Sequence, residues 1–125
     1  MFDLPRARMI KRRNDFQRVY RSGRSFACHH LVMYVLRDKH LAGRAGFAAG
    51  KKLGGAVVRV RVKRLLRECW RLHQAELPEE WAVLLVGRRP MVEAKCQTVE
   101  RDYVRLLRRV RKAMAAPASG PEAKS

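Results

Sequence analysis

Apolar residues recur along the chain with two different spacings, and the spacing predicts the type of each element. Repeats of three and four residues are typical of a helix with one buried face. Short unbroken apolar runs between turn residues are typical of buried strands. Ser22-Gly23, Gly54-Gly55 and Pro78 are such turn residues. The predicted elements are a helix at 14–21, strands at 27–37 and 44–50, a helix at 56–74, a strand at 81–86 and a helix at 92–114.

The order of these elements predicts an α+β fold in which helices pack on one small sheet. The chain has 125 residues, which suits one domain, and we expect that domain to span residues 1–114. Alanine, proline, serine and glycine dominate from Ala115 onward. Residues 115–125 are therefore predicted to form a disordered tail.

Charge is the most unusual property of the composition. The chain carries 29 lysines and arginines against 11 aspartates and glutamates, a formal net charge of +18. A charge this one-sided favours a polyanionic partner, and nucleic acid is the usual one. The basic residues fall mainly into three blocks, 6–24, 51–71 and 101–112. Apolar residues interrupt every block, so we interpret the blocks as charged faces of folded elements and not as a flexible membrane-binding tail.

Neither end of the chain suggests a membrane. No stretch approaches the roughly 20 consecutive apolar residues of a membrane-spanning helix. Charged residues follow the first few positions directly, without the apolar segment of a signal peptide. We expect a cytoplasmic protein that does not bind a membrane, and we predict no obligate protein partner.

The helix predicted at 56–74 separates apolar from basic residues. At about 100° per residue, its apolar side is formed by Val58, Val62, Leu65, Leu66, Cys69 and Leu72. The opposite side carries Arg59, Lys63, Arg64, Arg67 and Arg71, with Arg61 nearer the apolar edge and Val60 in the middle. A solvated helix face usually mixes both signs of charge, yet this one has only Glu68. Rows of guanidinium and ammonium groups suit a phosphate backbone, so we interpret this side as a nucleic-acid-binding face.

Residue types that serve catalysis or metal binding are present but scattered. Cys28, Cys69 and Cys96 fit no zinc-binding spacing, and we expect three reduced and mostly buried thiols. His29 and His30 would point to opposite faces of a strand and could not share one ion. The acidic residues form no cluster suited to Mg²⁺ or to general acid–base catalysis. We therefore predict no catalytic and no metal-ligating residue in the protein itself.

The chain resembles the bacterial ribonuclease P protein subunit. Residues 51–68, KKLGGAVVRVRVKRLLRE, are similar to that family's signature. In the signature, an Arg-Asn-Arg core is followed by Lys-Arg and then by Arg-Glu. Residues 15–25 resemble the family's first helix and turn, and residues 81–89 resemble its strand before a proline. The similarity covers roughly residues 8–112. Val60 stands where the family has Asn, and Gly55 where Asn is also common, so a side chain able to contact RNA or an ion is missing at Val60.

This resemblance implies the family's fold and activity. The fold would be a small two-layer α/β sandwich, its helices packed on one small mixed sheet, with a left-handed βαβ crossover. The activity would be Mg²⁺-dependent endonucleolytic removal of the 5′ leader from precursor tRNA. Catalysis and most of the Mg²⁺ would belong to the RNA subunit, so the protein's partners would be the ribonuclease P catalytic RNA and precursor tRNA.

Two sets of residues would divide the binding. The catalytic RNA would contact the basic residues that match the family's motif, namely Lys51, Lys52, Arg59, Arg61, Lys63, Arg64 and Arg67. The leader would lie in a cleft between the first helix and the sheet, against Phe16, Tyr20 and Tyr34. A base stacked on an aromatic ring gains about 1–3 kcal/mol whatever its identity. Phe16 and Tyr20, four residues apart, are equally suited to a hydrophobic core, and the sequence leaves that choice open.

Two other classes share this composition. One is a ribosomal or other non-catalytic RNA-binding protein, which would bind the catalytic RNA without increasing leader cleavage. The other is a basic protein of membrane surfaces or compacted DNA, which would bind anionic vesicles or duplex DNA as tightly as structured RNA.

Overall fold

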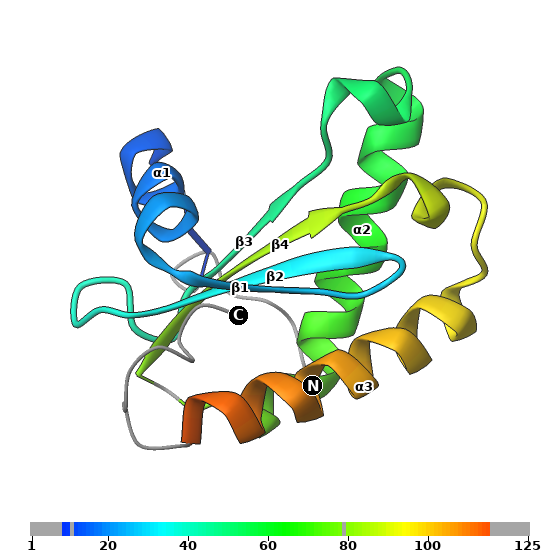
Figure 1. The fold of residues 1–125 in the computed structure, drawn as a ribbon. Helices are drawn as coiled ribbons and strands as arrows, with labels where there is room; N and C mark the ends of the chain where they lie inside the picture. Colours follow the sequence, from blue (N-terminus) through cyan, green and yellow to red (C-terminus); the bar gives the residue numbers. More distant parts are fainter. Residues whose placement is uncertain (1–8, 11, 79, 116–125) are drawn as a thin grey trace.

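The structure, a computed structural model, describes residues 9–10, 12–78 and 80–115. Its elements are α1 (Arg13–Ser22), β1 (Arg24–Ala27), β2 (Leu31–Arg37), β3 (Ala45–Ala48), α2 (Ala56–His73), β4 (Trp81–Gly87) and α3 (Cys96–Ala115), as Figure 1 shows, with short 3-10 turns at Lys51–Leu53 (η2), Gln74–Glu76 (η3) and Arg89–Val92 (η4). The predicted α+β class, with helices around one sheet, is confirmed. Residues 1–8 of the predicted domain and 116–125 of the predicted tail lie outside the described residues, and Ala115, expected to begin that tail, ends α3.

The single strand predicted at 27–37 is wrong, because that region forms a hairpin. β1 and β2 pair antiparallel with Phe26 opposite Met33. The Cys28 amide donates to the Leu31 carbonyl at 2.9 Å and closes the turn between them. His29 and His30 therefore lie in a turn and not in a strand, and their rings contact each other with centroids 4.8 Å apart. The strand argument that separated these two side chains was also wrong.

The sheet is mixed, with strand order β1-β2-β4-β3. β2 and β4 pair antiparallel over seven residues, whereas β3 and β4 are parallel neighbours. Parallel neighbours need a crossover connection, and α2 supplies it. The βαβ unit that the family resemblance implied is therefore present, while the left-handed sense of the crossover stays a prediction.

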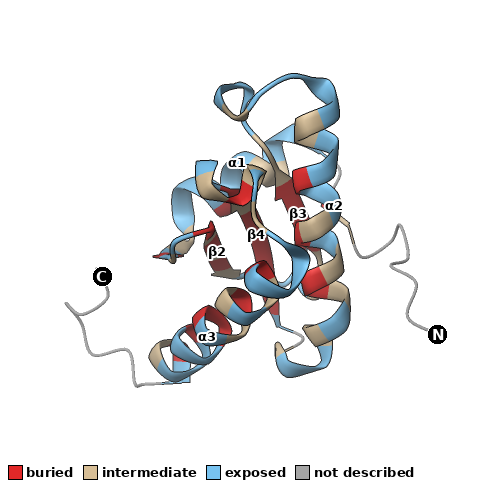
Figure 2. Ribbon diagram, turned by 90° about the vertical axis from the view of Figure 1, so that its right-hand side faces the viewer, coloured by how far each residue is buried: buried red, intermediate tan, exposed pale blue. Residues whose placement is uncertain are grey.

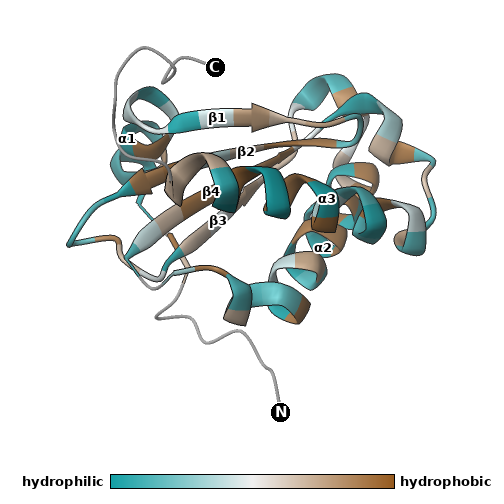
Figure 3. Cartoon of the chain, turned by 60° about the horizontal axis from the view of Figure 1, so that its bottom comes forward, coloured by the Kyte–Doolittle hydropathy of each residue, from teal (hydrophilic) through white to brown (hydrophobic). Residues whose placement is uncertain are grey.

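The two faces of the sheet carry separate hydrophobic cores. Alternate residues of β2 and β4, such as Met33 and Leu85, belong to a large core with α2 and α3. The residues between them, such as Leu84, pack with Val19 of α1 in a smaller core. Figure 2 shows the buried sides of the helices turned toward the sheet, and Figure 3 shows hydrophilic residues along much of α3. The sandwich of helices on a sheet is as expected for α2 and α3, and α1 adds cover to the opposite face.

The third helix begins at Cys96 and not at residue 92, because Arg89–Val92 forms a 3-10 turn around Pro90. Arg61 of α2 fixes the segment that follows this turn. Its guanidinium donates to the carbonyls of Val92 at 2.7 Å and Ala94 at 3.1 Å. No helix within the described part of the chain is both long enough and apolar enough to cross a membrane.

A histidine joins α2 to α3 at the end of the crossover helix. His73 Nδ1 lies 2.9 Å from Glu76, and its Nε2 lies 2.9 Å from Glu100 on α3. Both ring nitrogens can donate to carboxylates only when the imidazole is protonated. Burial of His73 favours the neutral ring, but the two carboxylates outweigh that effect and raise its pKa.

We expect this pair of contacts to make stability fall with rising pH. A raised folded-state pKa means that the stabilisation is complete below the unfolded-state pKa of about 6.5 and is lost as pH rises through the folded-state pKa. Chemical unfolding across that range should show a steeper decline for the parent protein than for His73→Gln. A Glu76→Gln/Glu100→Gln variant, which keeps the histidine and removes both carboxylates, should lose the steep decline as well. A parent-like slope in His73→Gln would contradict this account.

Candidate nucleic-acid interface

The buried side of α2 sets the orientation of its charged side. Val62, Leu66, Cys69 and Trp70 are the buried residues of α2. Leu72, expected on the apolar side, is instead 48% exposed. The predicted apolar side is thus confirmed for Val62, Leu66 and Cys69 and wrong for Leu72. Near the C-terminal end of the helix Trp70 is buried instead.

The opposite side of α2 is exposed and strongly basic. Lys63, Arg64 and Arg67 are solvent-exposed, and Arg67 lies above the Phe47 ring with its guanidinium carbon 6.0 Å from the ring centroid. The η2 turn immediately before the helix adds two further exposed lysines. We call this set the cationic face, formed by Lys51, Lys52, Lys63, Arg64 and Arg67.

Almost nothing within the described chain neutralises the cationic face. Glu68 is the only acid of α2, and its carboxylate is hydrogen-bonded to Arg71. That bond and the charge of Arg71 outweigh burial and lower the pKa of Glu68, so it stays ionised. No ion pair joins a residue of the cationic face to any other described residue. Like charges held together on one helix face are unfavourable until a polyanion offsets them.

Two of the predicted RNA contacts, Arg59 and Arg61, differ from the others. Arg59 is only half-exposed, and its Nε is buried without a hydrogen-bond partner among the described residues. Arg61 is exposed but already binds two backbone carbonyls near the start of α3. Both lie at the margins of the cationic face, and Arg61 has a structural role that its spacing in the sequence did not indicate.

An apolar spot interrupts the basic surface near the start of α2. Val57 is 84% exposed, and Val60, which replaces the family's Asn, is 47% exposed. Together with Ala56, Arg61 and Arg64 they line a shallow hollow of about 450 Å³. Val60 therefore projects from the basic side of the helix, as its position in the sequence predicted.

The three predicted aromatic residues meet on the other side of the sheet. Tyr20 of α1 and Tyr34 of β2 have ring centroids 5.0 Å apart, and Tyr20 is 53% exposed. Burial, with the nearby Tyr20, raises the pKa of Tyr34, so its phenol stays neutral. Phe16 is half-buried and lies so close to Gly46 that a Cβ there would be 2.9 Å from the ring. We call Phe16, Tyr20 and Tyr34 the aromatic surface; Phe16 serves mainly packing, whereas Tyr20 presents a ring to solvent.

Other reactive side chains are either paired or isolated. Asp38 accepts hydrogen bonds from the amides of His40 and Leu41 and pairs with Arg18 at 2.6 Å. Burial opposes the charge of Asp38, but these contacts lower its pKa.

Of the predicted reduced thiols, only Cys69 is buried, and burial raises its pKa to about 12. Cys28 is half-buried and Cys96 exposed, so the expectation of mostly buried thiols was wrong.

Comparison with known proteins gives consistent similarities. The family model described as Ribonuclease P matches residues 4–111. The ribonuclease P protein component of Pelotomaculum thermopropionicum is 42% identical over 81% of this chain and 90% of its own length. That of Desulfovibrio desulfuricans is 41% identical over 86% of this chain and 85% of its own.

Solved structures show the same fold. The RNase P protein from Staphylococcus aureus is 29% identical, with a TM-score of 0.75 over 84% of this chain and 96% of its own. The RNase P protein from Thermotoga maritima, at 23% identity, matches with a TM-score of 0.71 over 81% of this chain and 96% of its own, which supports the fold alone.

Proposed function

Because the chain belongs to the ribonuclease P protein family and is a protein component of that endoribonuclease holoenzyme, we propose how it divides its binding between two RNAs. The cationic face binds the catalytic RNA subunit. The aromatic surface binds the 5′ leader of precursor tRNA. The observation that carries the proposal is an exposed row of cations, free of acidic partners among the described residues, on the opposite side of the sheet from an exposed tyrosine.

The cationic face suits a phosphate backbone for electrostatic reasons. Each phosphate that a lysine or arginine neutralises releases condensed counterions, so affinity for RNA falls steeply with salt. The two arginines add planar forks that match phosphate oxygens. Because Arg59 and Arg61 lie at the margin and Arg61 already binds backbone carbonyls, they contribute less than Lys63, Arg64 and Arg67.

The aromatic surface suits a single strand of variable sequence. Every base has a face that can stack, so a ring binds a base whatever its identity. Tyr20 offers such a ring, and its contact with Tyr34 holds it over the sheet. Tolerance of sequence is the property that a protein needs when the leaders of its substrates differ.

We also propose that the Mg²⁺ of the reaction is held mainly by the RNA subunit. Among the described residues no three histidines, cysteines or carboxylates come together in a group that could hold a metal ion. Asp38 and Glu68 already pair with arginines of the chain. The described residues thus do not fit a Mg²⁺ site, which supports a part for the protein in binding RNA and in keeping the leader in place.

Reconstitution tests the proposal. The purified full chain, added to catalytic RNA and precursor tRNA at low Mg²⁺, should increase leader removal in proportion to holoenzyme formed. Binding without any gain in cleavage would assign it to a non-catalytic RNA-binding role. Equal affinity for duplex DNA or anionic vesicles at matched salt would contradict RNA specificity.

In the same assay, Tyr20→Ala should weaken binding of leader-bearing precursor to the holoenzyme. Loss of one stacked base predicts an affinity for the precursor that is about fivefold to hundredfold lower. The affinity for mature tRNA should stay unchanged. Leu72→Ala removes an equally exposed apolar side chain of α2 and should change neither. Equal losses for precursor and mature tRNA in Tyr20→Ala would show that the ring only stabilises the fold.

A further inference from the structure

The third basic block of the sequence, residues 101–112, belongs to neither surface proposed so far. It lies on α3, where four exposed cations fall within an arc of about 60° around the helix axis. Because a helix rises about 1.5 Å per residue, this row is about 16 Å long. We call it the α3 ridge, formed by Arg101, Arg105, Arg108 and Lys112.

The four charges of the α3 ridge have no partner within the described chain. None of the four side chains makes a hydrogen bond or ion pair with a residue in 9–10, 12–78 or 80–115. The two acids of α3 are directed to histidines, since Glu100 binds His73 and Asp102 binds His30. Two neighbouring arginines differ from the ridge: Arg109 donates to the Ala27 carbonyl at 2.7 Å, and Arg111 lies 3.9 Å from Glu76.

A small hollow of about 230 Å³ lies at the N-terminal end of the ridge. It is lined by His29, His30, Thr98, Arg101, Asp102 and Arg105. The Asp102 carboxylate accepts hydrogen bonds from the His30 amide at 3.1 Å and from its ring Nδ1 at 2.7 Å. These contacts outweigh burial and lower the pKa of Asp102. The buried His30 ring keeps its other nitrogen, Nε2, without a partner in the described chain.

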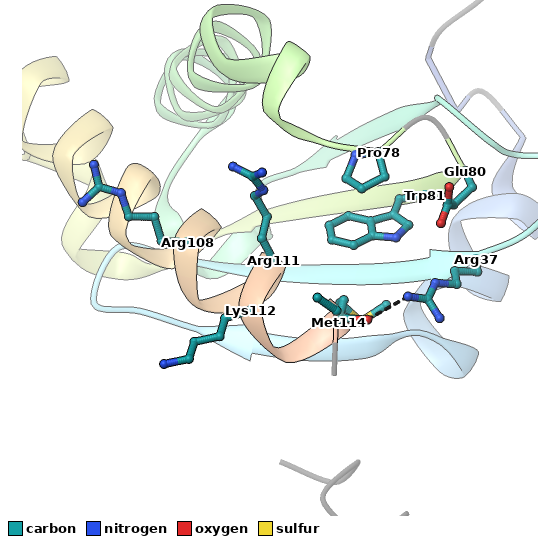
Figure 4. Close-up of a pocket in the computed structure, with 9 residues that line it drawn as sticks. Arg37, Pro78, Glu80, Trp81, Arg108, Arg111, Lys112 and Met114 are labelled. Carbon is teal, nitrogen blue, oxygen red and sulfur yellow. Dashed lines mark hydrogen bonds between the residues drawn. The ribbon is translucent and has the colours of Figure 1, made fainter. Parts of the chain in front are cut away.

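A larger hollow of about 480 Å³ lies at the other end of the ridge. Figure 4 shows Arg108, Arg111 and Lys112 extending from α3 beside it, with Trp81 across from them. Trp81 is 4% exposed, and its buried Nε1 donor has no acceptor among the described residues. Glu80 is the one acid among the described residues that line it. Each hollow therefore holds a polar ring nitrogen without a partner among the described residues, His30 Nε2 at one end of the row of cations and the Trp81 Nε1 donor at the other.

These features match the backbone of a nucleic-acid duplex. A double helix carries about one phosphate per 1.7 Å of axis counted over both strands, so a row of this length runs beside about ten phosphates, of which those on the near side can be contacted. Binding of a single strand would call for a series of exposed aromatic rings. None of the four ridge residues is aromatic, Tyr103 and Trp81 are buried, and the exposed His29 lies at one end of the row. Double-stranded RNA is recognised mainly by shape and by phosphate and ribose contacts, which a straight row of cations can make.

We propose that the α3 ridge is a second docking surface for the RNA subunit, which binds the phosphate backbone of a double-helical segment that the cationic face does not reach. The inference rests on the proposed function. A contact between His73 and Glu100 places the C-terminal end of α2 against α3, whereas the cationic face runs from η2 to the middle of α2 (Figure 1). The two surfaces are thus separate, and their contributions to binding free energy should add.

The test compares two doubly charge-reversed variants of the full chain. Arg105→Glu/Arg108→Glu removes the centre of the ridge. Arg12→Glu/Lys39→Glu makes the same change in net charge at two exposed residues outside all three surfaces. Affinity for the RNA subunit is measured over a series of salt concentrations. We expect the ridge variant to bind at least tenfold more weakly and with a salt slope smaller by about 2, and the control to stay within about threefold of the parent.

Footprinting of the RNA subunit identifies the contact directly. The ridge variant should lose backbone protection in one double-helical segment and keep the protection that depends on Arg64 and Arg67. Parent affinity, parent salt slope and an unchanged footprint in the ridge variant would overturn the inference while leaving the proposed function intact. A ridge variant that binds the RNA subunit normally but, within the holoenzyme, binds precursor tRNA more weakly would also overturn it. Failure of the parent protein to bind the RNA subunit would instead reject the proposed function.

Discussion

Arg64→Glu/Arg67→Glu should abolish assembly of the holoenzyme at ordinary salt while leaving the fold intact. Both side chains are exposed at the centre of the cationic face. A hydrogen bond to a charged group contributes roughly 1.5–3 kcal/mol, which is about tenfold or more in affinity per contact. Two lost contacts, together with repulsion between new carboxylates and phosphates, predict at least about a hundredfold weaker binding of the RNA subunit.

The measurement is a titration of labelled RNA subunit together with a melting curve of each variant. The fold should melt within a few degrees of the parent, because neither side chain is buried and neither pairs with an acid. Arg64→Lys/Arg67→Lys keeps the charge but loses the planar forks, so it should recover most of the affinity. Unchanged affinity in a charge-reversed variant that no longer melts cooperatively would contradict the role assigned to this face.

Gly87→Ala should destabilise the fold, although it adds only one methyl group. Gly87 is buried at the end of β4, and a Cβ there would overlap the Cγ1 of Val62 and meet the sulfur of Met91 at 3.4 Å. Overpacking of this kind costs about 1–3 kcal/mol. Since Val62 is the first buried residue of α2 and directly precedes Lys63, the added methyl should also move this part of the helix away from the sheet.

Gly50→Ala is the matched control for this prediction. A Cβ at Gly50 has no neighbour within 4 Å, and its φ of −72° suits alanine. Chemical unfolding should give a lower midpoint for Gly87→Ala than for the parent and a midpoint at or slightly above the parent for Gly50→Ala. A Gly87→Ala midpoint equal to that of the control would mean that Val62 can shift without cost.

The hairpin of β1 and β2 shows why one part of the fold could not be predicted. Residues 31–36 are an unbroken apolar run typical of a buried strand, while the turn consists of Cys28, His29 and His30, which are not typical turn residues. Asp102, far along the chain on α3, holds that turn through two hydrogen bonds to His30. A contact between residues 72 positions apart leaves no trace in a local pattern.

The helices were more predictable because their periodicity is local. Spacing alone placed the basic side of α2 correctly and identified Val62, Leu66 and Cys69 as buried. It failed at Leu72 and Trp70, near the end of the helix, where η3 and α3 decide which side is covered. The position of Arg61 against the carbonyls of Val92 and Ala94 also depends on a neighbouring segment, so only the fold could reveal that role.

The aromatic surface was predictable only through resemblance to a family. Phe16 and Tyr20 share a helix face at a spacing typical of a core, and one of them, Phe16, does pack mainly against the sheet at Gly46. Tyr34 comes from a strand that is apolar almost throughout, so its sequence indicates neither the face of this residue nor its neighbours. That Tyr20 stays exposed over Tyr34 follows from the angle at which α1 crosses the sheet, which no spacing in the sequence specifies.

The outer strand β1 has a consequence for the protein before it meets RNA. An unpaired strand edge invites copies of a protein to join through their backbones, and short, positively charged edges discourage this. β1 has four residues and begins with Arg24, and the carbonyl of Ala27 is already bound by Arg109. Mutual repulsion among chains of net charge +18 acts in the same direction. A newly made chain should therefore stay dispersed instead of aggregating, which keeps it available for assembly.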